Sequence, residues 1–368
     1  MMINQDDYKS LLSIRPIDFV PRIEKQKQNN YTEFKTEDMV AFPYFRNEEG
    51  KVTIRLYYPK AGSVVLMLQR NPVEMAKEGD YFLLETDLEE GIYPVVVTVD
   101  GNVVLDPFLP IGFGHNQPFN FIDLIDKNAY WAEKDVPHGH IESRYLYNHI
   151  TKRNERIFIY LPSGYDPSKK YDVLFLQHGF GENESSWLSE GRINLICDNL
   201  IANGKIEPLI VVMANGMLYR EEDGKIKMLN FRFKDHLKED LLPFVEKTYS
   251  YKDLYIAGLS MGSMQASITA IEFPDLFKGV GLFSGFLSDL ISGYKEHLLP
   301  EKITTLSQNK FLMRGIGDTD RFLPIFEKED VLLKEIDHVR KIYHGEHEWN
   351  VWREMIVDFL FLREQYHE

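Results

Sequence analysis

The 368-residue sequence has little cysteine: Cys197 stands alone, so an internal disulfide is excluded. This composition agrees with a reducing compartment, although a secreted protein without disulfides would look the same. Residues 1–19 also lack the basic start and the apolar centre of a signal peptide. From these two absences we expect a cytoplasmic protein.

Long apolar runs and an excess of basic residues are missing as well. The most apolar stretch, residues 209–214 (LIVVMA), is far shorter than the ~20 residues that cross a bilayer, so it predicts a buried strand. The formal net charge is -15, and binding to nucleic acid or to an anionic membrane requires a basic face. Neither nucleic acid nor a membrane is therefore expected as a partner.

The composition and the residue pattern predict a folded chain with two regions. Hydrophobic residues make up 44% and aromatic residues 13%, which is enough for a sizeable core. After an amino-terminal lead (1–35), residues 36–125 contain short β-rich runs between turn residues, the pattern of a small β-sandwich. In residues 126–368 strands alternate with helical stretches. This alternation predicts an α/β fold, a mostly parallel sheet with helices on both faces.

The most informative motif is Gly-Leu-Ser-Met-Gly at 258–262, between an apolar β-branched run and a row of helix formers. A G-x-S-x-G sequence in this context predicts a tight strand-to-helix turn that exposes Ser260 as a nucleophile. The N–H of Met261, at the start of the helix, would then face the developing oxyanion. The alternative is a strand that ends between glycines with Ser260 as a helix cap.

A serine nucleophile needs a base and an acid, which in this kind of sheet follow it in the order acid, then histidine. A predicted strand at 311–315 runs into a Gly-Asp-Thr-Asp loop, and we take Asp318 as the orienting carboxylate. The alternative is that Asp318 or Asp320 only caps the next turn. His347 lies between a loop and the last helix and is the expected base, whereas His344 is expected to be packed or solvated.

A second oxyanion donor is expected after an earlier strand, where the chain reads His-Gly-Phe-Gly at 178–181. The backbone N–H of Gly179 or Phe180 would act together with that of Met261. His178 is expected to fix this loop by hydrogen bonding. A second histidine pattern, His-Gly-His at 138–140, has no third ligand at metal-site spacing, so no metal is expected.

Several of these motifs together resemble the putative esterase (esterase D-like) family of α/β-hydrolases. The similar segments are 136–139, 156–165, 178–179, 187–211, 258–262 and 345–353. The family includes the feruloyl and acetylxylan esterases of carbohydrate esterase family 1 and the enterochelin esterases. The resemblance implies an α/β-hydrolase fold without a cofactor and a triad of Ser260, Asp318 and His347. It further implies substrate contacts for Trp187 and Trp349.

Residues 36–125 resemble the early-set, immunoglobulin-like module that precedes several such esterases. All four tryptophans lie outside this region, at positions 131, 187, 349 and 352. A module without tryptophan lacks the usual platform for stacking on sugars. A packing role, or a role as a wall of the active site, is therefore favoured over glycan binding.

The motifs and the resemblance together predict a serine carboxylic-ester hydrolase. It would remove acyl groups, feruloyl or acetyl, from sugars or oligosaccharides through an acyl-enzyme. One alternative is a siderophore trilactone esterase, which would use cationic side chains such as Arg192, Arg232, Arg321 and Arg353. The other is a non-catalytic carbohydrate-binding protein. The expected partner is a small-molecule or oligosaccharide ester. The sequence leaves open whether the chain forms a homo-oligomer.

Overall fold

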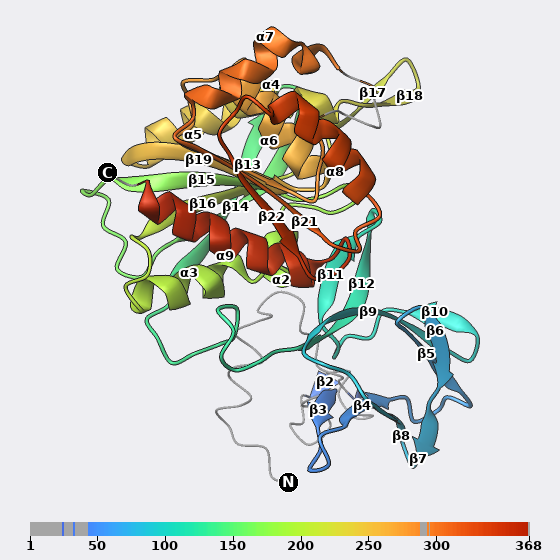
Figure 1. Ribbon diagram of the computed structural model, residues 1–368. Coiled ribbons are helices and arrows are strands. Elements are labelled where there is room, and N and C mark those ends of the chain that lie inside the picture. The colour runs from blue at the N-terminus through green and yellow to red at the C-terminus, as the bar shows by residue number, and fades with distance from the viewer. Residues whose placement is uncertain (1–23, 26–31, 34–42, 288–292, 294, 367–368) are drawn as a thin grey trace. The chain divides into compact units, whose positions relative to one another are not determined.

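The computed structural model describes residues 24–25, 32–33, 43–287, 293 and 295–366 (Figure 1). The contacts between Cα atoms divide the chain into two compact units. One unit comprises the described residues up to Gly112 together with Pro118–Lys127, and the other comprises Phe113–Gln117 and the described residues from Asn128 onward. Most of the predicted amino-terminal lead lies outside the described residues. Within that lead, Glu24–Lys25 (β1) pairs antiparallel with Thr32–Glu33 (β2).

The first unit is built on two antiparallel sheets that contribute to one hydrophobic core. One sheet contains β3 (Tyr44–Arg46), β4 (Val52–Tyr57), β7 (Ala76–Glu78) and β8 (Tyr81–Thr86). The other contains β5 (Val64–Leu68), β6 (Asn71–Glu74), β9 (Gly91–Val99), β10 (Asn102–Val104), β11 (Ile111–Gly114) and β12 (Gln117–Leu124). The fully buried Ile54 and Val97 come from different sheets and join the same core. This is the sandwich arrangement that the β-rich pattern predicts; its immunoglobulin-like assignment stays a prediction.

The second unit contains an eight-stranded sheet in the order β13-β14-β16-β15-β19-β20-β21-β22. These strands are β13 (His140–Asn148), β14 (Arg153–Leu161), β15 (Tyr171–Gln177), β16 (Leu209–Ala214), β19 (Tyr251–Leu259), β20 (Gly279–Phe283), β21 (Phe311–Gly317) and β22 (Val339–Tyr343). The pairings from β13 through β16 are antiparallel, and the others are parallel. Every residue of β15 and β16 is buried, as continuous apolar runs in a sheet covered on both faces require.

Helices cover both faces of this sheet. They are α2 (Ser186–Ser189), α3 (Ile193–Ala202), α4 (Phe233–His236), α5 (Leu242–Thr248), α6 (Met261–Glu272), α7 (Pro300–Ile303), α8 (Leu323–Glu329) and α9 (Trp349–Gln365). Figure 1 shows α3 and α9 on one face and α4, α5 and α6 on the other. Between β16 and α4, the strands Tyr219–Glu222 (β17) and Lys225–Met228 (β18) form a hairpin. The architecture is the α/β-hydrolase fold, as predicted.

No helix among the described residues is long and apolar enough to cross a membrane.

A buried ion pair joins the end of α9 to the start of β15. Arg363 Nε donates to Asp172 Oδ2 at 3.0 Å, and the two side chains are 0% and 1% exposed. We expect Arg363→Met to lower the free energy of unfolding by ~3–5 kcal/mol, because it leaves the Asp172 carboxylate buried without this cation. Denaturant unfolding measures the change. The double variant with Asp172→Asn should recover part of the loss, and an unchanged single variant would contradict the assignment.

Candidate active site

Ser260 occupies a sharp turn between β19 and α6, with φ 52° and ψ -116°. The flanking glycines are there because backbone passes close on both sides. A Cβ at Gly258 would lie 2.5 Å from the carbonyl of Gly262, and one at Gly262 would lie 2.6 Å from the carbonyl oxygen of Gln177. Such a positive φ is strained for a non-glycine residue and is typical of functional sites. The geometry is that of the nucleophile elbow predicted from the motif.

His347 connects Ser260 to a carboxylate. Its Nε2 lies 3.0 Å from Ser260 Oγ, and its Nδ1 lies 2.8 Å from Asp320 Oδ2. The side chain of Asp320 is fully buried, while that of His347 keeps a small exposed area. A serine, a histidine and a buried acid in hydrogen-bonding sequence is the arrangement that activates a hydroxyl nucleophile. The structure therefore brings Ser260 and His347 together, as expected.

The choice of Asp318 as the orienting acid is wrong. Strand β21 continues through Gly317, two residues beyond the predicted end, and the N–H of Asp318 still donates to Tyr343 of β22 at 2.7 Å. The exposed Asp318 carboxylate accepts the N–H of Gly345 at 2.9 Å and contacts His344 Nδ1 at 3.1 Å. The chain turns after this extension, and the turn buries the side chain of Asp320.

Asp320 serves two purposes at once. Its Oδ1 accepts the N–H of Phe322 at 2.9 Å, so it caps the following turn, while its Oδ2 faces His347. The alternative that this residue only caps the turn is wrong, because the capping oxygen leaves the second oxygen available for the histidine. A capping position therefore does not argue against a catalytic role.

The solvated pair formed by Asp318 and His344 is separate from this arrangement. The N–H of Gly345 and then His344 lower the pKa of Asp318 below its usual value, and the carboxylate in turn raises the pKa of His344. The side chain of His344 is 96% exposed, so the prediction of a solvated histidine is confirmed. This pair is screened by water and contributes little to stability.

Aromatic rings hold the imidazole of His347 in place. The ring of Phe322 approaches it edge-on with centroids 5.0 Å apart, and the ring of Trp352 does the same at 5.0 Å. Such contacts restrict rotation of the imidazole about its side-chain bonds. The histidine is therefore oriented by two rings as well as by Asp320.

The loop after β15 supplies backbone donors, but the expectation for Gly179 is wrong. Its N–H donates to Glu182 Oε2 at 2.7 Å. Within the described residues, the N–H groups of Phe180 and Met261 donate no hydrogen bond to the protein. The two donors that remain for an oxyanion are therefore Phe180 and Met261.

His178 fixes this loop, as predicted. It is 1% exposed; Nδ1 lies 2.8 Å from the carbonyl oxygen of Gly179, and Nε2 accepts the N–H of Gly216 at 2.8 Å. Burial lowers the pKa of His178, which favours the neutral ring that this pattern requires. Since both ring nitrogens are engaged with backbone, His178 does not act as the base.

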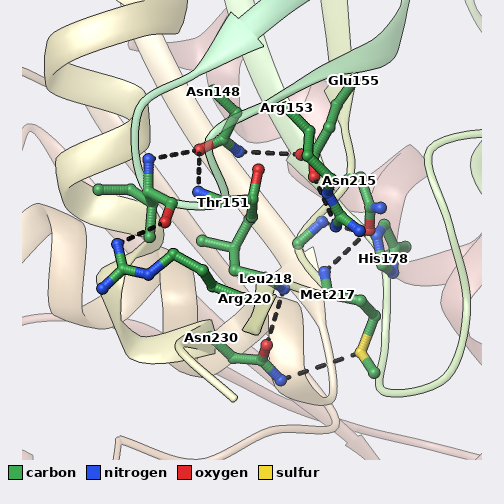
Figure 2. Close-up of polar contacts among 12 residues, drawn as sticks. Asn148, Thr151, Arg153, Glu155, His178, Asn215, Met217, Leu218, Arg220 and Asn230 are labelled. Atoms are coloured by element: carbon green, nitrogen blue, oxygen red, sulfur yellow. Dashed lines mark hydrogen bonds and ion pairs between the residues drawn. The ribbon is translucent and has the colours of Figure 1, made fainter. Parts of the chain in front are cut away.

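The segment after β16 completes the support of the loop (Figure 2). Asn215 Oδ1 accepts the N–H of Met217 at 2.9 Å, and Asn230 Oδ1 accepts the N–H of Leu218 at 2.9 Å. The sulfur of Met217 then accepts the N–H of Gly181 at 3.3 Å. A chain of polar contacts therefore reaches from this segment to the loop that carries Phe180.

Residues Phe113–Gln117, which belong to the second unit, lie against the same loop. A turn with positive φ at His115 and Asn116 connects β11 to β12. The N–H of Asn116 donates to the carbonyl of Gly181 at 2.8 Å, and a Cβ at Gly181 would lie 3.0 Å from the backbone of His115. No sequence motif predicts this contact, because the residues lie far from the catalytic motifs along the chain.

Two carboxyl groups, the partly buried Glu182 and the fully buried Glu190, lie beside this loop. Burial raises the pKa of Glu182 to about 7 and, together with the charge of Glu182, raises that of Glu190 to about 8. Glu190 is fully buried and accepts the N–H of Phe113 at 3.0 Å. Both groups therefore bind a proton more tightly in the folded chain than in the unfolded chain.

This predicts a stability that depends on pH. Because the native Glu190 keeps its proton to a higher pH than the unfolded residue, its contribution to stability is complete below about pH 4.5 and is lost as pH rises to about 8. We expect Glu190→Gln to reduce this fall. Melting temperatures between pH 5 and 9 measure it, and a variant with the same slope as the wild type would contradict the prediction.

Trp187 and Trp349, which are expected to contact substrate, are both buried in the structure. They are 1% and 7% exposed, their rings pack edge-on with centroids 5.0 Å apart, and the indole N–H of Trp187 donates to the carbonyl of Gln177 at 2.9 Å. The indole N–H of Trp349 donates to Glu182. An aromatic side chain that is exposed beside the site is Phe180, at 43%.

The histidine pattern at 138–140 has a structural explanation. His138 Nδ1 lies 2.9 Å from the buried carboxylate of Asp198, which also accepts the N–H of Gly139 at 2.9 Å and the hydroxyl of Tyr160 at 2.6 Å. In the part of the chain that is described, no group of three or more His, Cys, Asp or Glu side chains could hold a metal ion.

The fold and the serine, histidine and acid contacts define an α/β-hydrolase-fold chain with a nucleophile elbow. A family model described as Putative esterase matches residues 148–314, which confirms the resemblance inferred from the motifs. An endo-1,4-beta-xylanase/feruloyl esterase of Xylanibacter ruminicola is 31% identical over 315 residues, 82% of this chain and 41% of that protein. The chain thus spans less than half the length of this relative. An uncharacterized protein of Bacillus subtilis is 21% identical over 240 residues, 60% of this chain and 96% of its own.

Solved structures with the same fold include two kinds of esterase. A ferulic acid esterase from Anaeromyces mucronatus has a TM-score of 0.57 at 19% identity, covering 66% of this chain and 97% of that chain. An enterobactin esterase from Shigella flexneri has a TM-score of 0.61 at 14% identity, covering 88% and 96%. At these identities the likeness concerns the fold.

Proposed function

We propose that this chain is a serine carboxylic-ester hydrolase with Ser260, His347 and Asp320 as its catalytic triad. The observation that carries the proposal is the hydrogen-bonded sequence from Ser260 Oγ through His347 to Asp320, at 3.0 and 2.8 Å. The class agrees with the Putative esterase match.

The proposed reaction has two halves. Ser260 Oγ attacks the ester carbonyl carbon as His347 Nε2 takes the hydroxyl proton, and Asp320 stabilises the imidazolium. The N–H groups of Phe180 and Met261 would donate to the oxyanion. When the tetrahedral intermediate collapses, His347 gives its proton to the leaving alcohol. Water activated by the same histidine then releases the acid from the acyl-enzyme.

For the substrate we propose feruloyl or acetyl esters of sugars or oligosaccharides. Support comes from the relative named xylanase/feruloyl esterase, to which most of this chain aligns. The exposed ring of Phe180, next to the oxyanion donor, offers an apolar surface for an aromatic acyl group.

The second candidate is a siderophore trilactone esterase, favoured by the enterobactin esterase that covers 88% of this chain in fold. Three of the four cations considered for such a ligand weaken this candidate. Arg192 and Arg353 are buried, and Arg353 donates to the carbonyl of Glu190 at 2.7 Å. Arg232 is paired with Asp235 at 2.7 Å. The proposal therefore stays with sugar esters.

Purified protein assayed against p-nitrophenyl acetate, methyl ferulate, acetylated xylo-oligosaccharides and a catecholate trilactone tests these candidates. We expect turnover of the first two and of at least one sugar ester. Turnover of the trilactone alone would select the second candidate. No turnover together with no labelling of Ser260 by a fluorophosphonate would revive a non-catalytic carbohydrate-binding role.

A further inference from the structure

The loop that carries Phe180 passes in contact with the nucleophile. A Cβ added at Gly179 would lie 2.8 Å from the side chain of Leu259 and 3.5 Å from the Cβ of Ser260. There is accordingly little space between this loop and the serine. A small displacement of the loop would change the distance between its N–H groups and any oxyanion formed at Ser260, and donors act only when they are held at the oxyanion position.

Three successive backbone N–H groups of this loop differ in their hydrogen-bond acceptors. The N–H of Gly179 donates to Glu182 Oε2 at 2.7 Å, and the N–H of Gly181 donates to the sulfur of Met217 at 3.3 Å. The N–H of Phe180, between them, has no acceptor within the described residues. The two flanking contacts hold the peptide groups before and after the Gly179–Phe180 peptide, whose own carbonyl lies 2.8 Å from His178 Nδ1, and together these contacts set the direction of the Phe180 N–H.

Glu182 also contacts the other half of the site. Its carboxyl accepts the indole N–H of Trp349, the first residue of α9 and two residues beyond His347. The ring of Trp349 packs edge-on against Trp352 with centroids 5.2 Å apart, and Trp352 packs against His347 at 5.0 Å. One carboxyl group therefore joins the donor loop to the segment that presents the base.

We propose that Glu182 is a positioning residue for the ester hydrolysis proposed above: by accepting the N–H of Gly179 and the indole N–H of Trp349, it aims the Phe180 N–H at the oxyanion. Glu182 does not touch the reacting atoms. Above its pKa of about 7 the group is a carboxylate and both of its oxygens accept hydrogen bonds, whereas an amide offers one acceptor oxygen and one donor nitrogen. Gln at this position keeps one acceptor oxygen and places an NH2 donor where the carboxylate has its second oxygen.

The variants Glu182→Gln and Glu182→Ala test the proposal, with rates expressed per active site titrated by a fluorophosphonate. On p-nitrophenyl acetate we expect kcat to fall ~10-fold in Gln and ~100-fold in Ala, with KM nearly unchanged, because the oxyanion contact forms in the transition state. The affinity for an aryl trifluoromethyl ketone, which forms a tetrahedral adduct, should fall by the same factors. Inhibition by the product acid should not change.

Glu329→Gln is the matched control. Glu329 likewise accepts a backbone N–H, that of Leu287 at 2.8 Å; it is a buried carboxyl in α8 rather than a residue of the loop. It should lower the melting temperature without changing kcat per titrated site. If both Glu182 variants lose folded protein but keep the wild-type rate per site, Glu182 is only structural and the proposal is overturned.

The outcome for the wild type separates the two proposals. If the wild-type protein turns over no ester and Ser260 is not labelled, the proposed function fails. If the wild type is active and Glu182→Gln has the same kcat and the same affinity for the ketone, the hydrolase proposal survives and the role of Glu182 is refuted.

Discussion

Ser260→Ala is expected to abolish ester hydrolysis while leaving the fold intact. Removal of a triad nucleophile lowers kcat by ~10⁴ to 10⁶. Alanine fits the turn because it is smaller than serine, and the side chain that faces His347 Nε2 is lost with its hydroxyl. Initial rates on p-nitrophenyl acetate, a circular dichroism spectrum and a fluorophosphonate labelling gel measure the three consequences. Labelling should disappear together with turnover.

Ser263→Ala is a suitable control for this experiment. Ser263 lies three residues later in α6, it is 1% exposed, and its hydroxyl has no hydrogen-bond partner among the residues that the structure describes. This variant should keep the wild-type rate to within a few-fold. Hydrolysis by Ser260→Ala within tenfold of the wild type would refute the assignment of the nucleophile.

Asp320→Asn is expected to lower kcat by ~10⁴, because an amide that faces His347 Nδ1 favours the wrong tautomer of the imidazole. The carboxylate is fully buried and lies 2.8 Å from that nitrogen. The matched variant is Asp318→Asn, two residues earlier, whose exposed carboxylate contacts His344 instead. It should change kcat by less than a few-fold.

The comparison of these two variants separates the aspartates directly. Rates on p-nitrophenyl acetate at one pH between 7 and 8 are sufficient, since the expected ratio is large. If Asp318→Asn were the slower enzyme, the hydrogen bonds around His347 would not represent those of the working site.

The sequence predicted the parts of the site that depend on local geometry. Ser260 is recognisable because a strand, two glycines and a helix start must coincide at an elbow, and His347 because it lies where the last loop meets the last helix. Strand β16 follows from its composition alone, since six consecutive apolar residues are stable only between two covered faces.

Other parts depend on contacts that local sequence does not specify. The choice between Asp318 and Asp320 depends on where β21 ends, and pairing with Tyr343 of β22 carries the strand two residues further than its apolar residues indicate. Whether the N–H of Gly179 is available depends on the conformation of Glu182. Such effects arise only when distant segments pack.

The assignment of Phe113–Gln117 to the second unit affects how the protein can be dissected. Because these five residues interrupt the chain of the first unit, no single cut in the polypeptide yields both units complete. A truncation that starts at residue 128 would delete the N–H donors of Asn116 and Phe113, which donate to the carbonyl of Gly181 and to Glu190. Exchange of the amino-terminal module between relatives would have to retain this turn, and loss of activity after simple truncation would say nothing about glycan binding by the module.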